Sequence, residues 1–139
     1  MNEMMPPIIF LDIDGVMIAY SEEAMRMADD RWILLIDEVP AVGMNTWSDS
    51  DHLFSPEKLN DESLTNHLQI LSDLMRRDRN HPSVIMWSVA NEAATWERAS
   101  VPYFEKIFED VRSLDPSRAV TIVEAARAVS EPSRVNAST

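Results

Sequence analysis

Acidic residues recur at one kind of position in this chain, at or just beyond the end of a short apolar run. The four runs span residues 8–11, 33–36, 84–89 and 120–123. The acids that follow them are Asp12, Asp14, Asp37, Glu38, Glu92 and Glu124. Carboxylates at the ends of neighbouring strands can transfer protons as general acids and bases, or bind a hard cation such as Mg²⁺. The alternative is helix capping, because acids are also favoured at helix N-termini.

The apolar runs predict four strands. They are continuous rather than alternating, which is typical of strands buried on both faces of a parallel sheet. Between the first two, residues 21–30 open with a serine and two glutamates, a pattern that favours a helix N-terminus. Two further helices are indicated by apolar stripes at helical spacing, formed by Leu64, Leu68, Leu71 and Met75, and by Phe104, Ile107, Phe108, Val111 and Leu114. The order β-α-β-α-β-α-β predicts an α/β fold whose C-terminal strand ends share one edge.

The composition restricts the classes of partner. The 139 residues carry 24 acidic and 12 basic side chains, a formal net charge of −12, and 45% of them are hydrophobic. Such a charge argues against nucleic acid or an anionic membrane as the partner, and no apolar stretch reaches the roughly 18 residues of a membrane-spanning helix. Without cysteine, the chain has no thiol nucleophile and no thiolate metal site. The acidic, proline-containing start is unlike a signal peptide, so a cytoplasmic location is favoured.

The most specific motif surrounds the third predicted strand. Residues 78–92 read DRNHPSVIMWSVANE. This stretch resembles a signature of glycoside hydrolase family 2, which includes the β-glucuronidases and β-galactosidases. The similarity continues outside the motif, in residues 20–23, 33–43, 66–69 and 103–118, which resemble helices and strands of the family's catalytic barrel. Together these stretches cover most of the chain, from residue 20 to residue 123.

The resemblance implies a partial TIM (β/α)₈ barrel, with about four parallel strands alternating with three helices. A whole barrel of this kind takes about 250 residues, so the chain has about half the length that one requires. We expect residues 1–139 to form a single partial barrel domain, with an atypical N-terminal strand in residues 1–19 and a frayed tail in residues 125–139. The open edges of such a sheet favour self-association, and a homo-oligomer that rebuilds an eight-stranded barrel from two copies is one hypothesis.

The resemblance also implies a reaction, the hydrolysis of an O-glycosidic bond with retention of configuration and without a cofactor. β-Glucuronidase-like character is favoured over β-galactosidase-like character. The general acid/base maps onto Glu92, and Asn91 is expected to hydrogen-bond the 2-hydroxyl of a carbohydrate substrate. Asp37 and Glu38 are expected to line the same edge and to contact the substrate. His81, which precedes a proline ahead of the strand, is expected to have a structural role.

One part of this chemistry has no match in the chain. A retaining hydrolase needs a second carboxylate, the nucleophile, about 5–5.5 Å from the acid/base. In family 2 the nucleophile lies on a later strand, and no stretch of these 139 residues matches its motif. Glu38 and Glu124 lie at flanking strand ends, but neither aligns with it. The activity is therefore predicted to be incomplete, and a non-catalytic α/β fragment is an alternative.

A second resemblance concerns the N-terminal strand. Residues 8–16 read IIFLDIDGV and resemble the first motif of the haloacid-dehalogenase-like phosphatases. In that family the first Asp accepts the phosphoryl group, the second is the acid/base, and Mg²⁺ binds between them. These roles would map onto Asp12 and Asp14, so a Mg²⁺-dependent phosphatase is a further alternative. A strand that simply ends in a turn of this composition explains the same residues.

Overall fold

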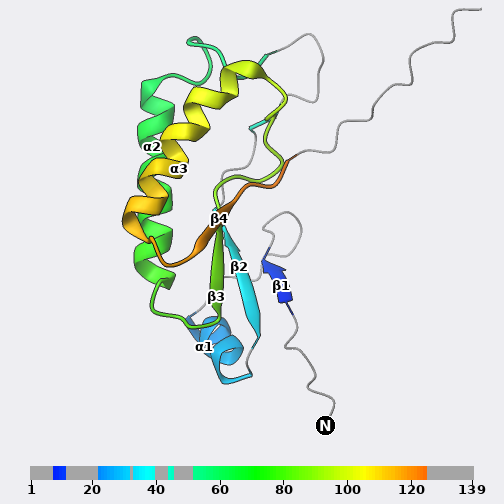
Figure 1. Cartoon of the computed structure of the whole chain (residues 1–139), viewed down its shortest axis with the longest axis vertical. Coiled ribbons are helices and arrows are strands. Elements are labelled where there is room, and N and C mark those ends of the chain that lie inside the picture. Colours follow the sequence, from blue (N-terminus) through cyan, green and yellow to red (C-terminus); the bar gives the residue numbers. More distant parts are fainter. Residues whose placement is uncertain (1–7, 12–21, 32, 40–43, 46–51, 125–139) are drawn as a thin grey trace, which may run out of the picture.

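Helices and strands alternate along the chain in the computed structural model, which describes residues 8–11, 22–31, 33–39, 44–45 and 52–124 (Figure 1). In chain order the elements are β1 (Ile8–Leu11), α1 (Glu22–Asp30), β2 (Leu34–Glu38), α2 (Asp61–Asp78), β3 (Val84–Ser88), the 3₁₀-helix η1 (Arg98–Ser100), α3 (Val101–Leu114) and β4 (Ala119–Thr121). This order confirms the predicted α/β fold class. No helix within these ranges is long and apolar enough to cross a membrane.

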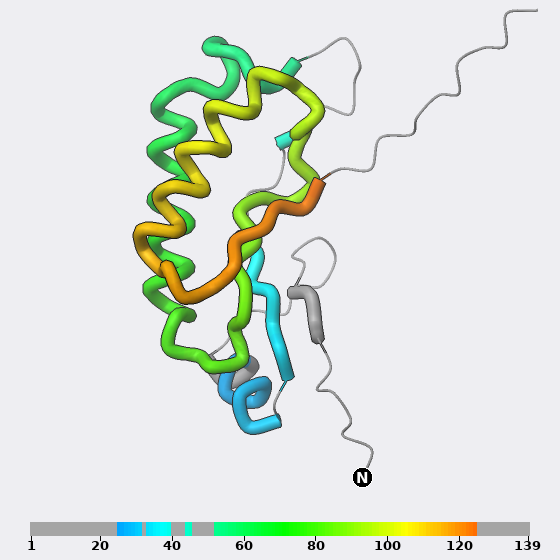
Figure 2. Tube along the Cα trace, in the orientation of Figure 1, coloured from blue at the N-terminus to red at the C-terminus, as the bar shows by residue number. Residues whose placement is uncertain are grey.

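The strands form one parallel sheet in the order β1-β2-β3-β4. Each strand therefore pairs with the strand before it in the chain, as in a barrel built from successive βα units. In the register of β2 and β3, Glu38 pairs with Ser88. Beyond β4 the chain continues beside the loop that follows β3, where Ala93 forms an isolated parallel bridge with Glu124 (Figure 2). The C-terminal ends of β2, β3 and β4 are thereby held next to one another.

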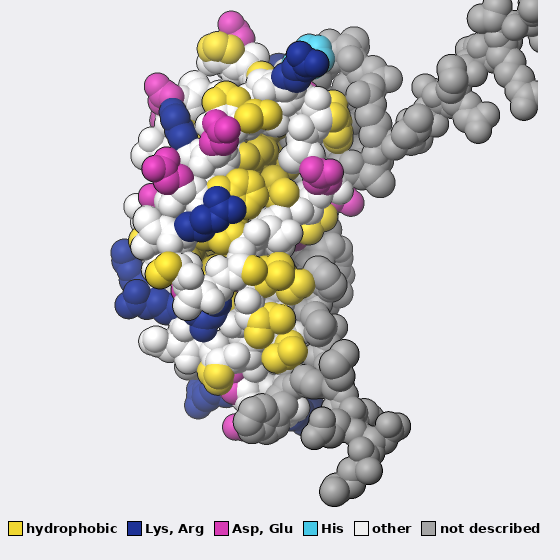
Figure 3. Space-filling view, viewed as in Figure 1, with side chains coloured by type: hydrophobic (Ala, Val, Ile, Leu, Met, Phe, Trp, Pro, Cys, Tyr) yellow, Lys and Arg dark blue, Asp and Glu magenta, His cyan; other side chains and the backbone are white. Residues whose placement is uncertain are grey.

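The two faces of the sheet differ in what covers them. The buried core cluster includes Leu35 of β2, Val84 and Trp87 of β3, Leu71 of α2 and Ile107 of α3. The helices α2 and α3 therefore pack on the face to which Leu35 and Trp87 point (Figure 1). Side chains alternate along a strand, so Ile36 and Met86 point to the other face, and both lie outside that cluster. Charged side chains lie mainly over the two helices, and hydrophobic ones gather toward the strands (Figure 3).

The helices α2 and α3 present the apolar stripes that their spacing predicts. The buried apolar positions of the stripes are Leu64, Leu71 and Met75 on α2 and Phe104, Ile107 and Val111 on α3. Burying a side chain of this size contributes about 1.5–3 kcal/mol, so the two stripes are a main source of stability. Leu114 is exposed, so the stripe of α3 ends one turn earlier than expected. At its start, α2 is capped by Asn60, whose Oδ1 accepts hydrogen bonds from two backbone N–H groups at 3.1 and 3.0 Å.

Polar contacts tie the N-terminal ends of the strands to the helices. Arg118, just ahead of β4, donates to Asp115 at 2.7 Å and to the first carbonyl of β3 at 2.6 Å. Its guanidinium lies 5.5 Å from the ring centroid of Trp87, which donates its indole N–H to Asp115 at 3.0 Å. Nδ1 of His81 lies 2.7 Å from Oδ2 of Asp29 in α1. His81 therefore joins α1 to the start of β3, in keeping with the structural role expected for it.

Replacing the N-cap of α2 tests how this helix begins. Asn60→Ala removes the acceptor of two backbone N–H groups, so we expect the free energy of unfolding to fall by about 1 kcal/mol. Chemical denaturation followed by circular dichroism measures the change. The control is Asn66→Ala at an exposed position of the same helix, where alanine has the higher helix propensity and should not destabilise. Equal losses in the two variants would contradict the capping role.

Candidate functional site

A hydrogen-bonded group of side chains forms at the C-terminal ends of β2 and β3. Glu38, the last residue of β2, accepts a hydrogen bond from Ser88 Oγ at 2.8 Å and another from Asn91 Nδ2 at 3.0 Å. The strand register dictates the first contact, because Glu38 and Ser88 are paired residues whose side chains share a face. Glu38 is 4% exposed, and a buried carboxylate needs such donors to be stable. The second contact fixes the amide of Asn91 with its nitrogen toward Glu38.

Glu92 follows Asn91 in a strained turn. Its φ is 42°, in the left-handed region that non-glycine residues rarely adopt, and no other non-glycine residue of the described ranges has a positive φ. A conformation of this kind costs about 1–3 kcal/mol and persists only where the surrounding structure holds it. Glu92 is half-buried, so it remains partly open to solvent at the strand edge.

Hydrogen bonds from two neighbouring segments hold this turn. Three backbone N–H groups of the turn donate to carbonyls outside it: Val89 to Thr121 at 2.9 Å, Ala93 to Val123 at 3.2 Å, and Ala94 to Met44 at 2.9 Å. In addition, Asn45 Nδ2 donates to the carbonyl of Glu92 at 3.3 Å. The end of β4 therefore supports one side of the turn, and residues 44–45, which follow β2 in the chain, support the other.

A buried histidine reaches the same turn from the helix layer. His67 of α2 is 5% exposed, and its Nε2 lies 2.8 Å from the carbonyl oxygen of Val89, just before Asn91 and Glu92. Its Nδ1 lies 3.1 Å from the hydroxyl oxygen of Tyr103 in α3. Burial lowers the pKa of His67, which favours the neutral ring. Sequence reasoning assigned no role to either residue, although a histidine on the apolar stripe of α2 was an available signal.

Asp37 and Glu38 are neighbours in sequence, but their side chains point to opposite faces of the sheet. Asp37 is fully buried on the helix-covered face, beside Asp78 at the end of α2. Within the described residues neither of its carboxylate oxygens has a hydrogen-bond partner. Burial, and then the charge of Asp78, raise the pKa of Asp37 to about 8, although Arg77 acts in the opposite direction. The structure thus does not bring Asp37 to the Glu38–Asn91 pair, and a contact between Asp37 and substrate stays a prediction.

The other predicted acids lie elsewhere. Asp12 and Asp14 fall outside the described residues, so the Mg²⁺ site that would use them stays a prediction. Glu124 is exposed and is paired in a parallel bridge with Ala93. The candidate site therefore consists of Glu92 and the group that Glu38 forms with Ser88 and Asn91.

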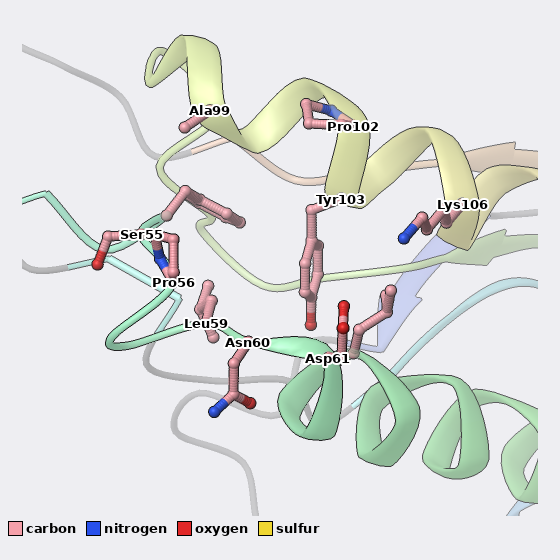
Figure 4. Close-up of a pocket in the computed structure, with 11 residues that line it drawn as sticks. Ser55, Pro56, Leu59, Asn60, Asp61, Ala99, Pro102, Tyr103 and Lys106 are labelled. Atoms are coloured by element: carbon pink, nitrogen blue, oxygen red, sulfur yellow. The ribbon is translucent and has the colours of Figure 1, made fainter.

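A pocket of about 430 Å³ opens between the N-terminal ends of α2 and α3 (Figure 4). Its walls are mainly apolar and include Pro56, Leu59 and Pro102. The side chain of Tyr103 extends from α3 toward α2 across this space, with Lys106 on the next turn of α3 (Figure 4). None of Glu38, Asn91 and Glu92 lines the pocket, so it is distinct from the candidate site at the strand ends.

A known family accounts for most of the chain. The profile of the family described as "Glycosyl hydrolases family 2, TIM barrel domain" matches residues 18–137. The chain belongs to glycoside hydrolase family 2. This membership confirms the resemblance seen in residues 78–92, and it confirms the fold class as part of a TIM barrel. The match begins after residues 8–16, so it lends no support to the phosphatase alternative.

Several β-glucuronidases are similar to this family 2 chain. The β-glucuronidase of Paenibacillus borealis is 49% identical over 105 residues, which are 76% of this chain and 18% of that protein. The structure of β-D-glucuronidase from Dictyoglomus thermophilum is 50% identical, with a TM-score of 0.73 over 76% of this chain and 18% of that chain. The Ruminococcus gnavus β-glucuronidase in complex with uronic deoxynojirimycin is 32% identical, with a TM-score of 0.65 over 82% of this chain and 18% of that one. The chain thus spans less than a fifth of the length of these relatives.

The buried acid Asp37 makes the stability of this family 2 chain depend on pH. Its pKa is about 8 in the folded state, against an ordinary value of 3.8. The folded state therefore keeps the proton on Asp37 up to a higher pH than the unfolded state does. The contribution of protonated Asp37 to the free energy of unfolding is complete below pH 4 and is lost as the pH rises toward 8. The side chain of Asp37→Asn stays neutral. We therefore expect the free energy of unfolding of this variant to exceed that of the wild type by about 2 kcal/mol or more at pH 8.

Urea denaturation at several pH values between 5 and 8 measures this effect. The control is Asp73→Asn on the exposed surface of α2, whose pH profile should follow that of the wild type. Parallel profiles for Asp37→Asn and the wild type would show that Asp37 is not the group responsible.

Proposed function

We propose that this chain supplies the acid/base half of a retaining glycosidase site, which hydrolyses the O-glycosidic bond of β-glucuronides. The observation that carries the proposal is the buried hydrogen bond between Glu38 and Asn91, directly before Glu92, at the strand edge of a family 2 barrel segment. Active sites of (β/α)₈ enzymes lie at this edge. The sugar is inferred from the relatives, which are named β-glucuronidases. The substrate is then a carbohydrate, and the reaction needs no cofactor.

In the proposed mechanism Glu92 transfers the protons. As a general acid it protonates the leaving glycosidic oxygen, and as a general base it then takes a proton from the attacking water. Both steps require a carboxyl group held at a fixed place, because a small misplacement of a catalytic group is costly to the rate. The support of the turn by Asn45 and by the backbone beyond β4 favours such a placement.

Asn91 positions the sugar in this proposal. Its Nδ2 donates to Glu38, so the plane of the amide is set before substrate binds. A hydrogen bond to the 2-hydroxyl strengthens in the transition state of glycoside hydrolysis. Glu38 acts by orienting Asn91 and does not attack the sugar, since it is buried and its two oxygens accept from Ser88 and Asn91.

Retention requires a second carboxylate about 5–5.5 Å from that of Glu92. Glu38 is engaged with Asn91, and Glu124 is exposed beside Ala93. The proposal therefore assigns the nucleophile to a part of the barrel other than the described residues. A second copy of the chain that closes the barrel through the edges of β1 and β4 stays a prediction about the oligomeric state.

Glu92→Gln tests the acid/base role directly. The amide cannot protonate the leaving oxygen, so we expect the turnover of phenyl β-D-glucuronide, measured with the nucleophile-bearing part of the barrel present, to fall at least about 100-fold. Phenol release is followed in the wild type, in Glu92→Gln and in Glu105→Gln, an exposed acid of α3 whose replacement should have no effect. Equal turnover in Glu92→Gln and the wild type would remove Glu92 from the mechanism.

Asn91→Ala tests the binding of the sugar independently of turnover. We expect the dissociation constant of uronic deoxynojirimycin, the ligand of the Ruminococcus gnavus relative, to rise about 3- to 10-fold because one hydrogen bond is lost. Isothermal titration calorimetry measures the change, with the exposed Asn80→Ala as the control variant. Uronic isofagomine lacks the 2-hydroxyl and serves as the control ligand, so its affinity should not change. Loss of affinity for both ligands alike would contradict a specific contact with the 2-hydroxyl.

A further inference from the structure

We propose that His67, itself oriented by Tyr103, is a positioning residue for the turn that carries Glu92. The inference deepens the proposed function and rests on it in one respect, that Glu92 is the group whose placement matters. Neither His67 nor Tyr103 touches Glu92. They act through the peptide group that follows Val89, at the point where the chain leaves β3.

The peptide after Val89 determines the direction in which the chain leaves the strand. The N–H of Val89 donates to Thr121 in β4, so the sheet fixes one side of this residue. Its carbonyl oxygen lies 2.8 Å from Nε2 of His67 in α2. Other hydrogen bonds join the rest of the turn to the sheet edge and to residues 44–45. His67 thus links the turn to the helix layer. Because the φ of Glu92 is strained, the turn must be held from several directions.

The hydrogen bonds determine which ring nitrogen of His67 carries the proton. A carbonyl oxygen only accepts, so Nε2 must be the N–H that donates to Val89. In a neutral imidazole the other nitrogen is then an acceptor, so Nδ1 receives the hydroxyl hydrogen of Tyr103. The structure therefore assigns a single tautomer, with a chain of donors that runs from Tyr103 through His67 to Val89.

Tyr103 is itself held in place by aromatic packing. Its ring centroid lies 5.6 Å from that of Phe54 and 5.4 Å from that of Phe104, in edge-on arrangements typical of stable aromatic pairs. The His67 ring lies 5.9 Å away. Because Tyr103 comes from α3 and His67 from α2, the packing of these two helices sets the position of the donor to Val89. A histidine that only filled space would need neither a fixed tautomer nor a hydrogen bond from the Tyr103 hydroxyl.

The wild-type chain offers the first test, because it needs no variant. Long-range ¹H–¹⁵N spectra of the imidazole rings at pH 7 should show His67 as the neutral tautomer with hydrogen on Nε2. Hydrogen on Nδ1, or rapid exchange between the two tautomers, would overturn the proposal.

Variants at position 67 separate the hydrogen bond from packing. His67→Gln keeps a side-chain N–H that can reach Val89, and we expect the backbone amide shifts of residues 89–93 to stay close to those of the wild type. His67→Leu fills the space without a donor, and we expect those shifts to move. The matched control is Leu71→Ala, a fully buried residue one turn further along α2, which lowers stability but should leave residues 89–93 unchanged. Unmoved shifts in His67→Leu, or equal movement in Leu71→Ala, would overturn the proposal.

Tyr103→Phe keeps the aromatic ring and removes only the hydroxyl, so it decides the matter if His67→Leu does not fold. We expect its His67 ring signals to broaden and the Val89 amide to shift, and no change at either place would overturn the role of Tyr103.

In the phenyl glucuronide assay, His67→Leu should lower kcat about 10-fold or more with KM within about two-fold, while His67→Gln keeps most of the rate. The spectra require no turnover. An unchanged rate in Glu92→Gln would therefore end the proposed function but leave the support of the turn by His67 standing, whereas unmoved spectra would end this inference alone.

Discussion

The pairing of β2 with β3 places the carboxylate of Glu38 opposite the hydroxyl of Ser88, and the candidate site is built outward from this contact. A shift of one residue would turn Glu38 toward the helices and bring Asp37 to the strand edge, because side chains alternate between faces. With the register as it is, a buried carboxylate lies at the end of β2 and must be given hydrogen-bond donors. Ser88 and Asn91 both supply such donors, so the contact with Asn91 builds on the carboxylate that the strand pairing places there.

The turn at Glu92 shows how the rest of the fold converges on that edge. A left-handed backbone conformation is unfavourable for a glutamate by itself. Here the chain around Glu92 is hydrogen-bonded to β4, to residues 44–45 and to α2. These supports come from elements that are distant in sequence and adjacent in space. Strained backbone held in this way is common where a side chain must be presented in one geometry. The support is therefore a property of the layered fold as a whole.

An excess of acids is accommodated inside this fold without a matching number of bases. The chain has 24 acidic and 12 basic side chains, and the buried residues of the described ranges include Asp37, Glu38 and Glu97. Glu38 accepts from a hydroxyl and an amide, and Glu97 accepts from the backbone N–H groups of Leu53 and Phe54 at 3.0 and 2.9 Å. Asp37, which faces the like charge of Asp78, is instead held neutral by a raised pKa. The three buried carboxyl groups are thus stabilised in three different ways, which depend on the atoms that each one contacts.

The sequence by itself determined the order of the elements, the family and the residues proposed to carry the chemistry. Continuous apolar runs and helical stripes are local patterns, and residues 78–92 form one unbroken motif that contains Asn91 and Glu92. Alternation along β2 also implies that Asp37 and Glu38 point opposite ways, but only the packing of α2 and α3 decides which of them faces the helices. The same packing brings His67 to Val89 and Tyr103 to His67, across 22 and 36 residues of sequence. Spacing along a chain fixes contacts within one element, whereas contacts between elements depend on how their surfaces meet, which is why the support of the site emerged only in three dimensions.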